Sequence, residues 1–514
     1  MATYTYDTAG RPTQVTKANG ANTAYGYNPT TGDLTSVLTT KSGQTVDGVS
    51  YTLDPANGRR TGITRSSNAA WTDTYGYDPA GQVTSGDYVG NATLTDEDFV
   101  YDPTGNRTSH TQNGTATAYT PNALDQYSAI ATLPQGHDLN GNMIGFIPPA
   151  TGATPISMAW DEGNQLIGAS RAAEGSTEAR NVLYRYDALG RRILKQVFDP
   201  STSPPTLKTT TAFIYDGWNV IEERELTTST KYRYTWGADV SGTHQRAGGD
   251  GGLLMAEATV GTGATEAHYY HYDGNGNVIA LTNTSGTREA RYRYTAFGGN
   301  AYTEAAPLTF GADQPYRFST KYLDREIEVR EGMYYYGYRY YLTCIGRWPN
   351  RDPIGERGGR NLLAIAGNKP ISYVDTDGRG AMAGVLPIAG GMAAADGPLP
   401  ILDIVAGVAI IGAGIYDLSQ PGPGTGNCST LYYGILKANV DAAKLETGIL
   451  KGCNDSNCCW VLKIKKTAWL GLAAARSVIN DKCFDGGDAG HQQAAAQAWQ
   501  NVVKCGEFIA SKCN

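Results

Sequence analysis

The chain has 514 residues, of which 64 are glycine and 34 are tyrosine, and only 18% are charged, against about 7% glycine and about 25% charged residues in ordinary globular chains. Its 40% apolar content can bury a large core, which excludes disorder and a disulfide-only scaffold for the whole chain. Glycine has no three-residue period and no heptad seam runs through the first 370 residues, so collagen and coiled coil are excluded as well. The composition is typical of a protein rich in turns and strands.

Charge and residue usage divide the chain in two. Residues 428–514 carry 10 basic and 7 acidic residues, which leaves 32 and 42 to the rest, so an acidic body carries a mildly basic tail. Seven of the eight cysteines lie in this tail, whereas all but three tyrosines precede residue 379. The N-terminus lacks the basic and apolar regions of a signal peptide. We expect the C-terminal part of a longer protein, exported without a general secretory signal.

Residues 1 to about 300 are one short unit repeated many times. Its aspartate (once asparagine) recurs mostly every 21 to 29 residues, at Asp7, Asn28, Asp54, Asp78, Asp102, Asp138, Asp161, Asp187, Asp216 and Asp273. Well-formed copies read YTYDTAGRPTQV, YGYDPAGQVTS and YHYDGNGNVIALT. Each copy predicts a strand, a turn and a returning strand.

The unit that starts at Tyr75 shows why. Tyr75 and Tyr77 are two residues apart and share a strand face, Asp78 can accept backbone N–H groups across the turn, and Gly81 can supply a positive φ. A lone hairpin is marginal in water, so about ten in series must stack edge to edge. We expect one long coiled β-sheet whose tyrosines pack its face. The alternative is carbohydrate binding by exposed aromatic rings.

These Tyr-x-Tyr-Asp-x-x-Gly-Asn/Arg units resemble the YD repeats of RHS proteins. The stretch from Tyr316 to Gly378, with its YYYGYRYY, GRW and RDPIG runs, resembles the RHS repeat-associated core. The resemblance implies a mainly β fold in which residues 1–315 form hairpins spiralled into a hollow shell and residues 316–379 form a core that closes one end. It also implies a polymorphic toxin of interbacterial competition, enclosed in the shell and delivered into target cells, with a cognate immunity protein and a secretion apparatus such as a type VI spike as partners. No cofactor and no metal site are expected.

Two carboxylates frame the end of this core, Asp352 in RDPIG and Asp375 in DTDG. Peptide hydrolysis needs a base to activate water and an acid to protonate the departing group, and two carboxyl groups held together can divide these roles. The family resemblance implies an aspartyl autoprotease that cuts after Arg379. This sequence departs from the family pattern, with Thr376 in place of proline and Arg379 in place of leucine. The alternative is that both aspartates only cap turns.

Residues 380–427 form an apolar linker rich in glycine and proline. Its tract from 381 to 418 is the only long apolar run, and it has a Gly397-Pro398 turn near its middle and Asp403 in its second arm. This pattern predicts a helical hairpin. It would either insert into a target-cell membrane or pack as a plug inside the shell.

Residues 428–514 predict a small disulfide-rich α-helical domain. The third of its helices is expected to begin at Asp488 as N-cap. Its apolar stripe consists of His491, Ala495, Ala498, Val502, Cys505 and Ile509. A disulfide framework is predicted for Cys428, Cys453, Cys458, Cys459, Cys483, Cys505 and Cys513. The alternative is a zinc cluster from Cys453, Cys458, Cys459 and Cys483.

The candidate chemistry of the tail lies at His491, with Asp485 and Asp488 beside it in a glycine-rich turn. A histidine with an acidic partner can act as base or acid in cleaving phosphodiesters, and Arg476 or Lys482 could hold phosphate. We expect a hydrolase such as an RNase, with nucleic acid as substrate. The alternatives are a capping role for these residues, a pore-forming toxin that depolarises a membrane, and a non-toxic shell or adhesin.

Overall fold

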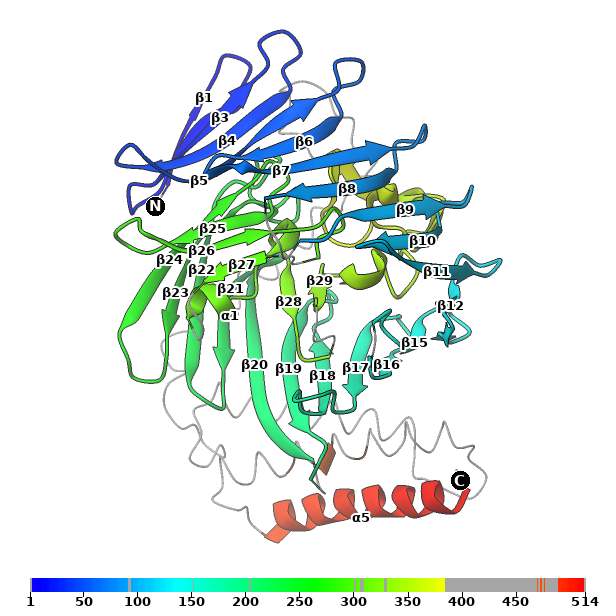
Figure 1. Cartoon of the computed structure of the whole chain (residues 1–514). Coiled ribbons are helices and arrows are strands. Elements are labelled where there is room, and N and C mark those ends of the chain that lie inside the picture. The colour runs from blue at the N-terminus through cyan, green and yellow to red at the C-terminus, as the bar shows by residue number, and fades with distance from the viewer. Residues whose placement is uncertain are drawn as a thin grey trace. The chain divides into compact units, whose positions relative to one another are not determined.

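The computed structural model describes residues 2–90, 94–150, 152–202, 205–299, 302–305, 309–327, 331–383, 469, 472–473, 476 and 489–512. The chain forms two compact units, Met1–Gly391 and Met392–Asn514. Antiparallel strands are the main secondary structure of the first unit (Figure 1). The mainly β prediction is therefore confirmed.

The first large sheet has 13 strands, each paired with its neighbour in the chain. They are β1 (Thr3–Tyr6), β2 (Pro12–Thr16), β3 (Asn22–Tyr27), β4 (Leu34–Lys41), β5 (Gln44–Leu53), β6 (Arg60–Arg65), β7 (Asn68–Tyr77), β8 (Val83–Val89), β9 (Glu97–Tyr101), β10 (Arg107–Gln112), β11 (Thr115–Pro121), β12 (Tyr127–Ile130) and β13 (Leu133–Pro134).

The second large sheet has 14 strands, again in chain order. They are β14 (Gly136–His137), β15 (Met143–Phe146), β16 (Ile156–Trp160), β17 (Leu166–Arg171), β18 (Arg180–Tyr186), β19 (Arg192–Asp199), β20 (Thr206–Asp216), β21 (Asn219–Glu225), β22 (Thr230–Trp236), β23 (Leu253–Thr259), β24 (Thr265–Tyr272), β25 (Val278–Thr282), β26 (Arg288–Arg293) and β27 (Tyr302–Ala305).

The prediction of one continuous sheet is wrong at a single joint. The backbone ladder breaks between β13 and β14, where Gln135 lies. Its side-chain amide takes the place of a strand partner, because Ile147 N donates to Gln135 Oε1 at 2.9 Å and Gln135 Nε2 donates to Ile147 O at 3.3 Å. The hairpins therefore continue in series across the break.

Short elements make up the rest of the first unit. They are α1 (Phe310–Asp313), the 3-10 helices η1 (Phe318–Thr320), η2 (Thr343–Ile345), η3 (Gly355–Gly358) and η4 (Ile365–Asn368), and the strands β28 (Tyr322–Asp324), β29 (Met333–Tyr335), β30 (Tyr340–Leu342), β31 (Tyr373–Asp375) and β32 (Ala381–Ala383). Strands β28 to β30 form a three-stranded sheet, and β31 pairs with β32. The predicted helical hairpin from 381 is thus wrong for its first three residues, because Asp375 pairs with Ala381 in a tight reversal. The rest of the linker lies outside the described residues.

The predicted turn chemistry is confirmed in the unit at Tyr75. Gln82 N donates to Asp78 Oδ1 at 2.8 Å, and Gly81 has φ of 83°. The same carboxylate-capped turn recurs at Asp102, whose Oδ1 accepts N–H groups from Thr104 and Asn106 at 2.9 Å. These turns therefore close on their own aspartates.

The aromatic residue directly before most of these turns makes a second, regular contact. Its polar atom donates to a backbone carbonyl near the start of the preceding strand. Tyr101 Oη donates to Val83 O at 2.8 Å and Tyr186 Oη to Leu166 O at 2.6 Å. Tryptophan replaces tyrosine at position 160, and its Nε1 donates to Met143 O at 2.8 Å. The same bond is made by Tyr27, Tyr77, Tyr215, Tyr272, Tyr294 and Trp236. These side chains join one hairpin to the next, and their rings pack in the core, as predicted.

Buried ion pairs join the beginning of the first sheet to the end of the second. Arg293 on β26 donates through Nε to Asp73 Oδ1 on β7 at 2.9 Å, and Arg291 Nε lies 2.8 Å from Asp47 Oδ2 on β5. Strands β5 and β25 are also in contact, and the blue and green strands lie beside each other in Figure 1. The two large sheets thus close on each other.

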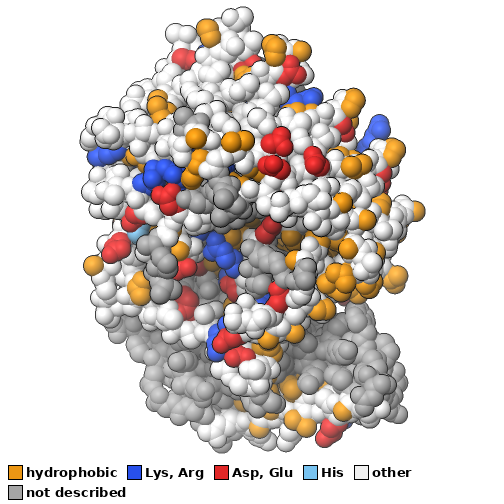
Figure 2. Space-filling view, viewed as in Figure 1, with side chains coloured by type: hydrophobic (Ala, Val, Ile, Leu, Met, Phe, Trp, Pro, Cys, Tyr) orange, Lys and Arg blue, Asp and Glu red, His pale blue; other side chains and the backbone are white. Residues whose placement is uncertain are grey.

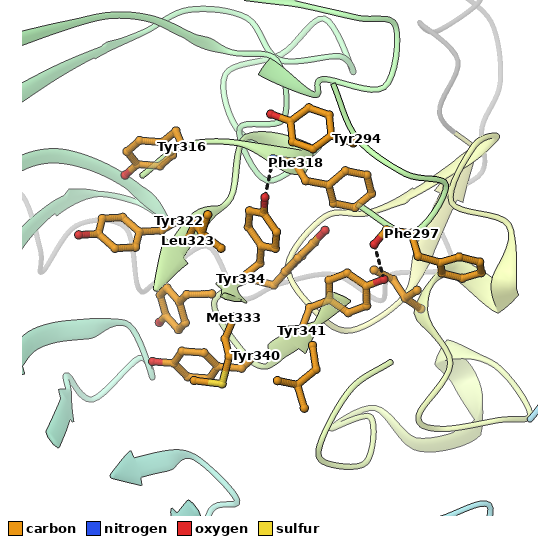
Figure 3. Packing of buried hydrophobic residues seen from close by; sticks show 14 of the residues in the cluster. Tyr294, Phe297, Tyr316, Phe318, Tyr322, Leu323, Met333, Tyr334, Tyr340 and Tyr341 are labelled. Carbon is orange, nitrogen blue, oxygen red and sulfur yellow. Dashed lines mark hydrogen bonds between the residues drawn. The ribbon is translucent and has the colours of Figure 1, made fainter. Parts of the chain in front are cut away.

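The segment from 310 to 383 packs a dense aromatic cluster against these sheets. Figure 3 shows its centre, where Phe318 N donates to Tyr334 Oη and Tyr341 Oη donates to Phe297 O. Tyr334, Tyr341 and Trp348 are at most 1% exposed. On the viewed face of the molecule, basic and acidic side chains are interspersed rather than gathered in one patch (Figure 2). The inward-facing aromatics therefore form the core from which the site below is built.

The second unit is described mainly through α5 (Ala489–Lys512). Ala495, Ala498, Val502 and Cys505 are buried, which confirms this part of the predicted apolar stripe. Cys505 takes part in a disulfide bond; the wider framework stays a prediction, because the other cysteines of the tail lie outside the described residues. No helix in the described part of the chain has the length and apolar character that crossing a bilayer requires.

Replacing Arg293 tests whether the buried ion pairs hold the two sheets together. Arg293→Met leaves buried Asp73 with Arg65 as its partner at 3.1 Å, and we expect a loss of about 2 kcal/mol in the free energy of unfolding, the scale of a lost hydrogen bond to a charged group. The matched control is Arg233→Met, because Arg233 is mostly exposed and pairs with Glu222 at the surface; its effect should stay below about 0.5 kcal/mol. Urea unfolding followed by tryptophan fluorescence measures both, and equal losses would contradict this role.

Candidate functional site

The predicted cleavage position lies in the turn between β31 and β32. Gly378 has φ of 86°, and a β-carbon there would come within 3.1 Å of Arg339 N. Tyr338 N donates to Asp377 O at 3.0 Å. The turn from 376 to 380 is therefore pressed against the segment that connects β29 and β30, and glycine is required where the two backbones meet.

Asp375 ends β31 and caps this turn from inside. Its Oδ1 accepts the backbone N–H of Gly378 at 2.8 Å, of Arg379 at 3.1 Å and of Gly380 at 3.4 Å. Asp375 therefore does cap a turn, as the alternative interpretation predicted. The Gly380 nitrogen belongs to the peptide bond after Arg379, so the same carboxylate also lies at the amide side of the predicted scissile bond.

Asp352 reaches the site from the turn that precedes η3. Ile354 N donates to its Oδ1 at 2.9 Å, and Asp352 N donates to Leu362 O at 3.0 Å, which fixes the side chain. A β-carbon on Gly358 would lie 2.9 Å from Arg379 O and would also collide with Asp352 Oδ2. The carbonyl oxygen of the predicted scissile bond and the Asp352 carboxylate therefore both lie beside Gly358.

Arg339 joins the two carboxylates. Its Nη2 lies 2.8 Å from Asp352 Oδ2 and 3.4 Å from Asp375 Oδ2. Its Nε donates to Gly378 O, and its guanidinium stacks over the Trp348 ring at 4.2 Å. Sequence reasoning missed this residue. The available signal was an arginine inside the aromatic run YYYGYRYY, since an arginine buried among aromatic side chains needs carboxylate partners.

The electrostatics of this group favour one shared proton. Burial raises the pKa of Asp352 and of Asp375, and the positive charge of Arg339 only partly offsets it. Asp377 raises both pKa values further through its negative charge. Because two buried carboxyl groups share one guanidinium, ionisation of both at once is disfavoured. The pair can then hold an acid and a base at the same time.

The second predicted site falls largely outside the described residues. His491 lies in the first turn of α5, but Asp485, Asp488 and the His491 side chain are not described. Arg476, predicted to hold phosphate, donates through Nη1 to Ala494 O on α5. That bond gives Arg476 a structural role in packing the helix.

Comparisons with known proteins agree with this architecture. The RHS Repeat family model matches residues 6–45, and the model Novel toxin 16 matches residues 424–508. The tRNA3(Ser)-specific nuclease WapA of Bacillus spizizenii is 28% identical over 282 residues, 54% of this chain and 10% of that protein. Toxin protein Tse5 of Pseudomonas aeruginosa is 30% identical over 241 residues, 43% and 17% of the two chains. This chain therefore spans only a small part of the length of these relatives.

Two further proteins are similar to this chain over a longer stretch. Toxin subunit YenC1 of Yersinia entomophaga is 24% identical over 428 residues, 73% of this chain and 42% of that protein. The crystal structure of TcdB2-TccC3-Cdc42 superposes with a TM-score of 0.59 and 21% identity over 73% of this chain and 19% of that one. Serial YD hairpins closed by an aromatic core define an RHS-type repeat protein. The two model matches and these relatives are consistent with an RHS/YD-repeat polymorphic toxin.

Replacing Arg339 tests the electrostatics of the carboxylate pair. Arg339→Met removes the shared guanidinium, and we expect a loss of about 3 kcal/mol in the free energy of unfolding near pH 7.5. Both carboxyl groups have folded-state pKa values above the unfolded value, so their ionised forms cost stability as pH rises, and protonation removes that cost as pH falls. The deficit relative to the parent should therefore shrink near pH 5. Urea midpoints at the two pH values measure it, and a deficit independent of pH would contradict this account.

Proposed function

We propose that this chain is an RHS-type antibacterial effector that cuts its own backbone after Arg379 and so frees the C-terminal toxin from a β-shell. The observation that carries the proposal is the placement of two carboxyl groups at the two sides of one peptide bond. Asp375 Oδ1 lies 3.4 Å from Gly380 N, and Asp352 flanks the same point as Arg379 O. A pair of merely turn-capping aspartates would have no reason to converge on that bond.

The proposed reaction is a single hydrolysis. Ionised Asp352 takes a proton from a water molecule, whose oxygen adds to the Arg379 carbonyl carbon. Protonated Asp375 gives its proton to Gly380 N as the C–N bond breaks. The products are a carboxyl group on Arg379 and an amine on Gly380. Because each chain is cut once, neither proton has to return for a second turnover. Arg339 positions both carboxylates throughout.

We expect the purified protein to separate under denaturing conditions into fragments of 379 and 135 residues. In native gel filtration the two should elute together, because β32 stays paired with β31 and the shell holds its cargo without a covalent bond. Intact mass would place the cut between Arg379 and Gly380. A full-length mass for the parent chain would refute self-cleavage.

The role of Asp352 is tested by Asp352→Asn. The amide keeps the hydrogen bonds of the turn but cannot take a proton from water, so the chain should remain uncut with its fold retained. Glu356→Gln is the matched control, because Glu356 is an exposed carboxylate on η3 close to Asp352 and should not affect cleavage. Cutting of the Asp352→Asn chain at the parent rate would remove Asp352 from the mechanism.

We further propose that the released domain cleaves RNA, with His491 as acid or base and Asp485 and Asp488 beside it. The match of residues 424–508 to a toxin family supports a toxic domain, and the nuclease names of the WapA relatives support nucleic acid as its substrate. A cognate immunity protein and a delivery apparatus follow as expected partners of such an effector.

Expression of the full chain with His491→Ala tests this activity. The substitution should remove growth inhibition and RNA cleavage, whereas Gln493→Ala, an exposed position two residues along the same helix, should leave both unchanged. Growth, RNA integrity and membrane potential are followed together. Killing by the His491→Ala chain with loss of membrane potential would replace the hydrolase by a pore-former.

A further inference from the structure

The side chain of Arg379 is held by a dedicated set of contacts. Its Nη2 lies 2.7 Å and its Nε 3.0 Å from Asp377 Oδ2. The guanidinium carbon lies 3.9 Å from the centre of the Tyr338 ring. The guanidinium thus has a carboxylate at its edge and an aromatic ring on its face, the two kinds of partner that a planar cation prefers.

This platform, the Asp377 carboxylate and the Tyr338 ring, is supported by four separate segments of the first unit. The Tyr338 ring packs on Trp218, between β20 and β21, with ring centres 4.6 Å apart. Tyr338 N donates to Asp377 O at 3.0 Å, which couples the ring to the cleavage turn. Lys321 Nζ donates to Thr376 O at 2.7 Å and holds the start of that turn. A cavity of about 110 Å³ adjoins the platform and is lined in part by Trp218, Lys321 and Asp377.

We infer that Asp377 and Tyr338 are specificity-determining residues of the self-cleavage site and select an arginine at position 379. The inference rests on the proposed self-cleavage and adds to it the identity of the residue before the cut. The carbonyl carbon to be attacked belongs to Arg379 itself, so anchoring that side chain on Tyr338 and Asp377 also orients the carbonyl toward Asp352. An apolar side chain can make neither the ion pair nor the cation–π contact.

The ion pair between Arg379 and Asp377 also affects the charge around the two carboxyl groups of the site. Asp377 raises the pKa of both Asp352 and Asp375, and Arg379 is its partner at 2.7 Å. An apolar residue at 379 would leave this carboxylate unpaired beside the reacting pair. The family pattern has leucine at this position, and the arginine of this chain is accompanied by an acidic residue two positions earlier. The two residues act as a matched pair.

The test follows the rate of self-cleavage of the full chain during cell-free synthesis. Arg379→Leu should slow cutting by roughly tenfold, the scale of one charge-assisted contact, and Arg379→Lys should be slowed less because it keeps the cation. The double variant Asp377→Leu with Arg379→Leu should be faster than Arg379→Leu alone, since no unpaired carboxylate remains. Arg360→Leu, a change of an exposed arginine in the same core, should match the parent.

The ring is tested by a second pair of variants. Tyr338→Leu should slow cutting, though less than Arg379→Leu because the pair with Asp377 remains, and Tyr338→Phe, which keeps an aromatic face, should restore most of that loss. Tryptophan fluorescence and gel filtration of each variant confirm that the fold is retained. A rate for Arg379→Leu equal to that of the parent, while Asp352→Asn stays uncut, would overturn the specificity inference and leave self-cleavage standing. An uncut parent chain would overturn both.

Discussion

The structure depends on how each hairpin is closed and tied to the one before it. The aspartate of every well-formed repeat caps its own turn, as Asp78 does for Gln82 N. The aromatic residue before that aspartate reaches back to a carbonyl near the start of the preceding strand, as Tyr101 does to Val83. Trp160 makes the same bond with an indole N–H. One local motif therefore specifies both the reversal of the chain and the docking of successive hairpins, so a long coil of sheet can grow from identical steps.

The two large sheets also have to close on each other, and buried ion pairs rather than the repeated motif make this closure. Arg291 and Arg293 near the end of the second sheet meet Asp47 and Asp73 near the start of the first. Arg192 on β19 meets Asp324 on β28 and so ties the core segment to the sheet. Buried ion pairs add little net stability compared with apolar packing. Each buried charge needs its partner at a fixed distance, so the ion pairs favour one pairing of the two sheets over shifted pairings.

The packing of these segments also fixes the positions of the side chains in the candidate site. The cleavage turn is held at its start by Lys321, from the side by Tyr338 and from inside by Asp375. Arg339 is buried with two carboxylates, and burial raises the pKa of both, so the group can keep one proton. In the proposed self-cleavage, the turn that carries the bond is part of the same packed core as the two carboxylates.

Features that depend on residues close together in the chain could be predicted from the sequence alone. The repeated hairpins, the capping role of Asp78, the positive φ of Gly81 and the buried stripe of α5 follow from spacings of a few residues, and they were predicted correctly. Asp352 and Asp375 were found as candidates through their motifs and the family resemblance. The break at Gln135 and the strand Ala381–Ala383 were not predicted, because each depends on a partner segment rather than on its own pattern.

Only the tertiary structure decided which groups meet at the site. Arg339 is 13 and 36 residues from the two aspartates that it joins, and the contact of Gly358 with Arg379 O joins two separate turns. No periodicity marks such pairs, because they come together only when the aromatic core has packed. The sequence by itself determined the repeating strand, turn and helix patterns and the candidate carboxylates. The packed core decided their convergence on one peptide bond, since the distances that matter there are set by contacts between segments and not along the chain.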